Sequence, residues 1–159
     1  MTRIAQIGSA CLLVAGVLML YADPLAGMVE QWNASPMYSY AFTVPLISLY
    51  VLWSQRHSFM ARRPRPARLA GGVVLAAALL LLVLGQVASV QIVQQLSFLV
   101  ALVGLVLFLF GPAWLGVAAP ALGYLLFMVP FWDAFTEPLH WPFQNNSAKL
   151  GVAMLHAVG

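Results

Sequence analysis

The side chains that could attack or protonate a bond are few, and their spacing does not fit a catalytic or metal site. The one thiol, Cys11, falls within an apolar stretch, where a buried thiol stays protonated and inert. Asp133, Glu137 and His140 lie close together in the sequence, but Pro138 interrupts any helix that would place them on one face. We therefore predict that this chain contains no catalytic residue, no metal site and no cofactor site.

The composition excludes a soluble enzyme domain. Of the 159 residues, 63% are hydrophobic and 7% are charged, whereas a soluble domain carries about 25% charged residues. The net charge of +3 does not indicate nucleic acid as a partner, because most of the basic residues lie between Arg56 and Arg68 and form no stripe elsewhere. The sequence predicts an all-α integral membrane protein, surrounded by membrane lipid.

The membrane-spanning helices are predicted from the uncharged stretches, because a helix needs about 20 apolar residues to cross a bilayer. The long uncharged block from Leu69 to Trp132 is divided at its polar glutamine-rich stretch and at Gly111-Pro112. About five transmembrane helices result, over residues 4–22, 38–54, 69–87, 93–110 and 114–131.

The remainder of the chain is predicted to lie outside these spans. Residues 132–147 are expected to form an external loop. Residues 148–159 are expected to form a partial, truncated C-terminal helix, capped by Asn146 or Ser147. Residues 1–159 would then constitute a single multi-pass membrane domain.

The orientation follows from the separation of opposite charges. Arg3 and the arginines between residues 56 and 68 fall on one side, and the carboxylates fall on the other. The positive-inside rule makes the N-terminus and residues 55–68 cytoplasmic and residues 133–149 external. A cleaved signal peptide over residues 1–22 is the alternative, but nothing like Ala-x-Ala precedes Asp23-Pro24.

Two segments combine prolines and aromatic residues on the predicted external side. The first, from Trp32 to Arg56, contains Pro45, which removes a backbone donor and is expected to kink its span. The second extends from Phe127 to Ala148. We expect residues 32–45 and 130–147 to pack together, and the alternative is that each segment anchors independently at the interface.

These segments resemble motifs of the exosortase family of the EpsH type. That family comprises multi-pass membrane proteins that process exported proteins bearing a C-terminal PEP-CTERM sorting signal. Tyr40 stands where the family often has His, and Phe143 replaces the usual Leu. The matches in the first segment are Trp32, Ser35, Pro36, Tyr38, Ser39, Ala41, Val44, Pro45, Trp53 and Arg56. The matches in the second are Phe127, Met128, Val129, Pro130, Pro142, Gln144, Ser147 and Ala148.

The resemblance implies where these residues act. The motif residues are expected to form the substrate cleft or to have a structural role. They are Trp32, Pro36, Tyr38, Ser39, Pro45, Trp53, Arg56, Pro130, Pro142, Gln144 and Ser147. It also implies a bacterial inner membrane location and exported proteins with a C-terminal sorting signal as partners.

The family's activity is that of a cysteine transpeptidase or peptidase. Its nucleophile lies in an Ala-Cys-Ser-Gly stretch beyond the second motif, with Arg and His further on, and Cys11 matches none of these. We therefore expect the N-terminal, non-catalytic portion of an exosortase-like protein, which cleaves nothing by itself. The alternative is a small non-enzymatic membrane scaffold or accessory subunit. A transporter subunit ranks third, because the predicted spans carry no charge.

Overall fold

The computed structural model describes residues 3–34, 36–129, 142–150 and 152, and it divides the chain into two compact units. The first unit covers Met1–Val129 and the second covers Pro130–Gly159. Throughout the described ranges the regular structure is helical, with no strand. The predicted all-α membrane fold is confirmed.

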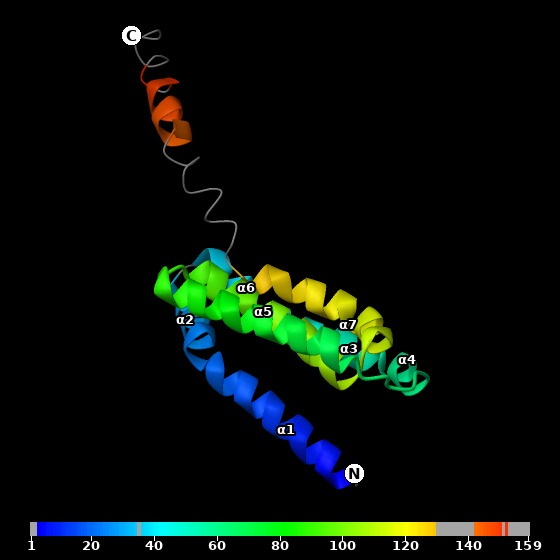
Figure 1. Ribbon diagram of the computed structural model, residues 1–159. Coiled ribbons are helices and arrows are strands. Elements are labelled where there is room, and N and C mark those ends of the chain that lie inside the picture. The colour runs from blue at the N-terminus through cyan, green and yellow to red at the C-terminus, as the bar shows by residue number, and fades with distance from the viewer. Residues whose placement is uncertain (1–2, 35, 130–141, 151, 153–159) are drawn as a thin grey trace. The chain divides into compact units, whose positions relative to one another are not determined.

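The first unit is built around a hairpin of two long helices (Figure 1). The hairpin consists of α5 (Arg68–Val87) and α6 (Gln91–Leu109). The elements that precede it are α1 (Arg3–Leu20), α2 (Ala22–Ala34), the 3₁₀ helix η1 (Pro36–Phe42), α3 (Thr43–Ser54) and α4 (Arg56–Met60). The elements that follow it are α7 (Pro112–Tyr124) and the 3₁₀ helix η2 (Leu125–Met128).

Two helices in the described part of the chain are long and apolar enough to cross a membrane, and these are α5 and α6. They agree with the predicted spans 69–87 and 93–110 to within two residues. The pair Cys11–Leu20 and Ala22–Ala34 is bent by 56° and makes a third span if it is counted as one. The predicted spans 38–54 and 114–131 are each divided between a 3₁₀ helix and an α-helix of 12 or 13 residues.

Glycines allow α5 and α6 to approach closely. A Cβ at Gly71 would lie 2.5 Å from the Phe108 Cα, and a Cβ at Gly104 would lie 3.0 Å from the Leu75 backbone nitrogen. Small residues are the usual means by which membrane helices bring their backbones together. The hairpin turn passes through Ser89, whose φ is 55°.

The arginine-rich segment after α4 is fixed to the turn between α6 and α7. The Arg65 N–H donates to the Phe110 carbonyl at 3.1 Å. The Arg62 Nη1 donates to the Ala113 carbonyl at 2.7 Å, and the Trp114 Nε1 donates to the Arg62 carbonyl at 3.2 Å. One main-chain hydrogen bond and two from side chains to main-chain carbonyls thus hold this segment beside the end of α6.

The second unit is described only over residues 142–150 and 152, which are helical and exposed. Residues 142–147 are helical, so this part of the predicted loop is wrong, and Asn146 and Ser147 lie within the helix rather than capping it. Pro142 is its first described residue, and proline is favoured in a first helical turn, where its missing N–H has no partner to lose. Asp133, Glu137 and His140 lie outside the described residues.

Candidate functional site

Trp32 joins the two motif segments of the sequence. Its indole Nε1 donates to the Met128 carbonyl at 3.0 Å, and its ring meets Phe42 edge to face at 5.2 Å. Trp32 is 7% exposed, and Met128 is also buried. The first motif segment therefore contacts the start of the second at Met128. The predicted contact with residues 130–147 stays a prediction, because residues 130–141 lie outside the described part.

Helix η1 buries one face of the first motif and exposes the other. Tyr38 and Ala41 are buried, as expected for residues three apart on a 3₁₀ helix. Ser39 and Tyr40 are exposed, and the Tyr40 carbonyl accepts a hydrogen bond from the Thr43 Oγ1 at 2.6 Å. Tyr40, which stands where the exosortase motif often has His, is therefore accessible.

Trp53 and Arg56, the last two residues of the first motif, lie at the end of α3 farther from η1. Trp53 is 67% exposed, and the Arg56 guanidinium lies over its ring at 5.3 Å from the ring centroid. Arg56 also donates from Nη1 to the Trp53 carbonyl at 3.2 Å. Since α3 has 12 residues, about 18 Å of helix separates this pair from η1. The described residues of the first motif therefore extend along α3 and do not gather at one place.

The other predicted site residues are distributed over the two units. Pro36 is exposed at the start of η1, and Pro45 is half-buried in the first turn of α3. Pro142, Gln144 and Ser147 are exposed in the second unit, and Pro130 lies outside the described residues.

Cys11 is exposed on α1 and is not buried against other helices. The apolar surroundings expected for it are therefore not provided by the protein. Within the described residues, no three His, Cys, Asp or Glu side chains gather in a way that could hold a metal ion.

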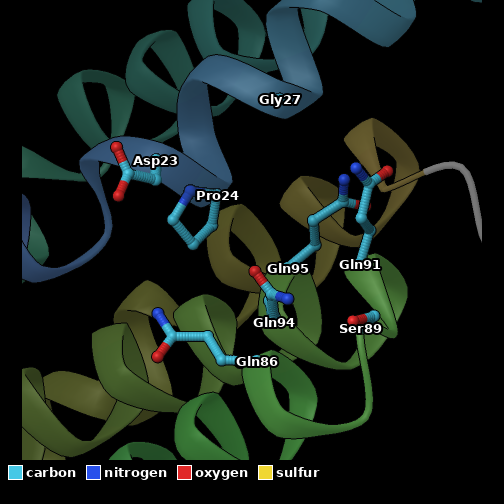
Figure 2. Close-up of a pocket in the computed structure, with 8 residues that line it drawn as sticks. All are labelled: Asp23, Pro24, Gly27, Gln86, Ser89, Gln91, Gln94 and Gln95. Atoms are coloured by element: carbon cyan, nitrogen blue, oxygen red, sulfur yellow. The ribbon is translucent and has the colours of Figure 1, made fainter.

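A polar pocket of about 350 Å³ lies where α2 crosses the turn between α5 and α6 (Figure 2). The α2 side contributes three residues of its first two turns, and the hairpin contributes amides and one hydroxyl. The lining residues are Asp23, Pro24, Gly27, Gln86, Ser89, Gln91, Gln94 and Gln95.

Hydrogen bonds between glutamines connect this pocket to Trp32. Gln95, only 2% exposed, donates from Nε2 to the Gln31 Oε1 at 3.0 Å. Gln31 in turn donates from Nε2 to the Gln91 Oε1. Gln31 immediately precedes Trp32 in α2, so the same helical turn reaches both the pocket and Met128.

In the sequence, these glutamines served only to divide two predicted spans, and the pocket was not predicted. A usable signal was present, because Gln91 and Gln95 are four residues apart and therefore share a helix face. Polar side chains that face the interior of a membrane helix bundle commonly mark functional positions.

Comparison with known proteins identifies the family of this chain. The model of the transmembrane exosortase family (Exosortase_EpsH) matches residues 32–159. No curated protein and no solved structure matches the chain. The family match begins at Trp32, the residue bonded to Met128, and it covers most of the 159 residues. The chain therefore belongs to the transmembrane exosortase family.

Proposed function

We propose that this chain forms a membrane portion of an exosortase-like transpeptidase or peptidase and carries no catalytic residue itself. It receives the C-terminal PEP-CTERM tail of exported proteins at the external face of the bacterial inner membrane. The proposal depends on the hydrogen bond from Trp32 to Met128. In this member of the exosortase family, that bond joins the two motif segments at one end of the helices.

The distribution of charge supports an external position for that end. Asp23 lines the pocket beside the α5–α6 turn, and α2, which also carries Glu30, lies across this end. Arg62 and Arg65 bind the backbone of the α6–α7 turn at the other end of α6. By the positive-inside rule, the arginine end is cytoplasmic and the Trp32 end is external.

The chemistry of the chain supports a non-catalytic role. Attack on a peptide bond needs an activated nucleophile within reach of a base. Cys11 is the one thiol of the sequence, and it lies on α1.

In this proposal, Ser39 and Tyr40 contact the tail, since both are exposed on η1 beside the buried Tyr38.

Crosslinking tests the proposal. Ser39→Cys would be introduced with Cys11→Ala and coexpressed with an exported reporter that carries a PEP-CTERM tail with cysteines along its membrane-proximal part. We expect a disulfide between the tail and position 39. Ser58→Cys, exposed on α4, serves as the matched control and should stay unlinked. Equal linkage at both positions, or none at position 39 along the whole tail, would contradict the proposal.

The non-catalytic assignment needs a second assay. We expect no processing of the reporter when this chain is its sole partner, and processing when a frame containing Ala-Cys-Ser-Gly is supplied. Processing by this chain alone, lost in Cys11→Ala, would overturn the assignment.

A further inference from the structure

Three of the five arginines at residues 56–68 have side chains that the described part of the protein leaves unpaired. Arg56 and Arg62 each donate to a main-chain carbonyl. Arg63, Arg65 and Arg68 are exposed, and among the described residues their side chains make no hydrogen bond or ion pair. We refer to these last three residues as the arginine surface.

The main chain that carries the arginine surface is fixed against the α6–α7 turn. Arg63 and Arg65 each precede a proline, which favours an extended conformation at both, and residues 63–67 form no helix. The Arg65 N–H donates to the Phe110 carbonyl, and a Cβ at Gly111 would clash with the Arg65 carbonyl. Because this contact uses main-chain atoms, the arginine side chains are held close together and remain available to another partner.

The arginine surface concentrates positive charge without a counter-charge nearby. An extended chain rises about 3.3 Å per residue, so Arg63 and Arg65 are about 7 Å apart, within the Debye length of about 8 Å at physiological ionic strength. The described carboxylates, Asp23 and Glu30, belong to α2, which lies across the opposite end of α6. Binding of an anion would relieve the repulsion between the arginines.

The arginine surface lies at the level of the lipid headgroups. Helix α5 begins at Arg68 and has 20 residues, so it is about 30 Å long, which is the thickness of the hydrocarbon core. Beside this end of α5, the Trp114 Nε1 donates to the Arg62 carbonyl, and the Trp114 ring stacks on Phe110. Tryptophan commonly lies at the headgroup level. Both observations place the unpaired arginines where phospholipid phosphates are concentrated.

The chemistry of the guanidinium group selects among the lipids. Arginine binds phosphate through two parallel N–H···O bonds, which suits the phosphate of any phospholipid. In phosphatidylcholine, however, the headgroup carries its own cation, so the headgroup has no net charge. Phosphatidylglycerol has no such cation, and basic residues at a membrane surface attract lipids with a net negative charge.

We infer that Arg63, Arg65 and Arg68 bind the phosphate of anionic phospholipids, and that this lipid holds the α6–α7 turn and the start of α5 at the membrane surface. The inference goes beyond the proposed function and is independent of it, because the exported tail takes no part. It is also independent of the orientation, since both leaflets of a nanodisc have the same composition.

Paramagnetic lipids test the inference. The whole chain, carrying Cys11→Ala and Met60→Cys, would be labelled with a trifluoromethyl group and placed in phosphatidylcholine nanodiscs. Met60 is 79% exposed at the end of α4, three residues before Arg63. A small fraction of nitroxide-labelled phosphatidylglycerol, or of phosphatidylcholine with the same label, would then be added. The relative association constant of the two lipids follows from the fluorine line broadening as that fraction is varied.

We expect phosphatidylglycerol to broaden the signal at position 60 more than phosphatidylcholine does, and saturably. At Val87→Cys, 81% exposed at the other end of α5, the two lipids should broaden the signal equally. Raising the salt concentration to about 1 M, where the Debye length is about 3 Å, should remove most of the preference at position 60.

Two matched variants separate the arginine surface from net charge. Arg65→Gln should lower the preference for phosphatidylglycerol about fivefold, as for the loss of one basic residue at a membrane surface. Arg56→Gln removes the same charge at the same end of the protein, but its guanidinium already lies over Trp53, so it should change the preference little. Both variants should keep the unfolding temperature of the parent, since the Arg65 main-chain bond is retained.

Several outcomes would overturn the inference. Equal broadening by the two lipids at position 60 of the unsubstituted surface excludes a preference, whatever the variants do. An equal loss in Arg56→Gln and Arg65→Gln would mean that net charge alone attracts the lipid. Loss of the preference on adding millimolar inorganic phosphate, with sodium chloride of equal ionic strength having no effect, would assign the surface to a soluble anion. Failure of the tail crosslinking leaves this inference intact, and failure of the lipid preference leaves the proposed function intact.

Discussion

The indole Nε1 of Trp32 donates to the backbone carbonyl of Met128, 96 residues later in the chain. Met128 is the last residue of η2, where a carbonyl lacks a partner within its own helix. The tryptophan therefore caps a distant helix end, and it determines where the second motif segment starts relative to the first.

Trp32→Phe should lower stability by about 1–3 kcal/mol, because it retains a ring in the core but leaves the buried Met128 carbonyl without its donor. Thermal unfolding in detergent micelles measures the effect. Trp53→Phe is the matched control, since Trp53 is mostly exposed and should tolerate the change. Similar melting temperatures for the two variants would refute the role of the Trp32 bond.

Ser48→Ala should have a smaller effect, about 0.5–1.5 kcal/mol. The buried Ser48 Oγ donates to the Ala121 carbonyl at 2.8 Å and so joins α3 to α7. That carbonyl also accepts the Leu125 N–H, so it keeps one partner in the variant. Ser54→Ala, at an exposed position of α3, should leave the unfolding temperature unchanged. A loss as large as that of Trp32→Phe would contradict this ranking.

Gly71→Ala and Gly72→Ala should have opposite effects, although they are adjacent in α5. A Cβ at Gly71 meets the Phe108 backbone and would force α5 and α6 apart, whereas a Cβ at Gly72 meets nothing within 4 Å. Alanine in a helix interior is favoured over glycine by about 0.5–1 kcal/mol. Thermal unfolding should show Gly72→Ala at or above the parent and Gly71→Ala well below it. Equal stabilities would mean that the helices do not depend on this close approach.

Accessibility to an impermeant maleimide in intact cells tests the orientation. With Cys11→Ala as background, Ser89→Cys at the α5–α6 turn should react, because that turn is proposed to be external. Arg63→Cys, in the arginine-rich segment, should react only after the cells are opened. Cysteines at residues 133–149 are expected to react as Ser89→Cys does. The reverse labelling pattern would invert the topology.

Sequence reasoning predicted α5 and α6 well because their length and continuous apolar character depend on local composition alone. It ended the first span near Ala22, at the charge of Asp23, whereas the structure continues as α2 to Ala34. A charged residue excludes a segment from hydrocarbon but does not prevent it from being helical, and Asp23 is favourable in a first helical turn.

The pairings between distant residues could not be predicted in this way. Nothing in the sequence around Trp32 indicates that its partner is Met128, or that Gln31 meets Gln95. Such contacts depend on how α2 crosses the hairpin, and hydrophobic periodicity carries no information about that crossing. Similarly, η1 is followed directly by α3, which begins at Thr43. The sequence predicted one continuous span here, and the change from a 3₁₀ helix to an α-helix is seen only in the structure, where Tyr38 and Ala41 are buried.

The separation of Trp32 from Met128 also affects how the chain is synthesised and inserted. A ribosome adds about 5–20 residues per second, so about 5 to 20 s pass between the synthesis of the donor and of its acceptor. During that interval α5 and α6 are completed and can form their hairpin, since only a short turn separates them. The hydrogen bond of Trp32 therefore forms only after the hairpin has been synthesised, because its acceptor belongs to η2, the last helical element of the first unit.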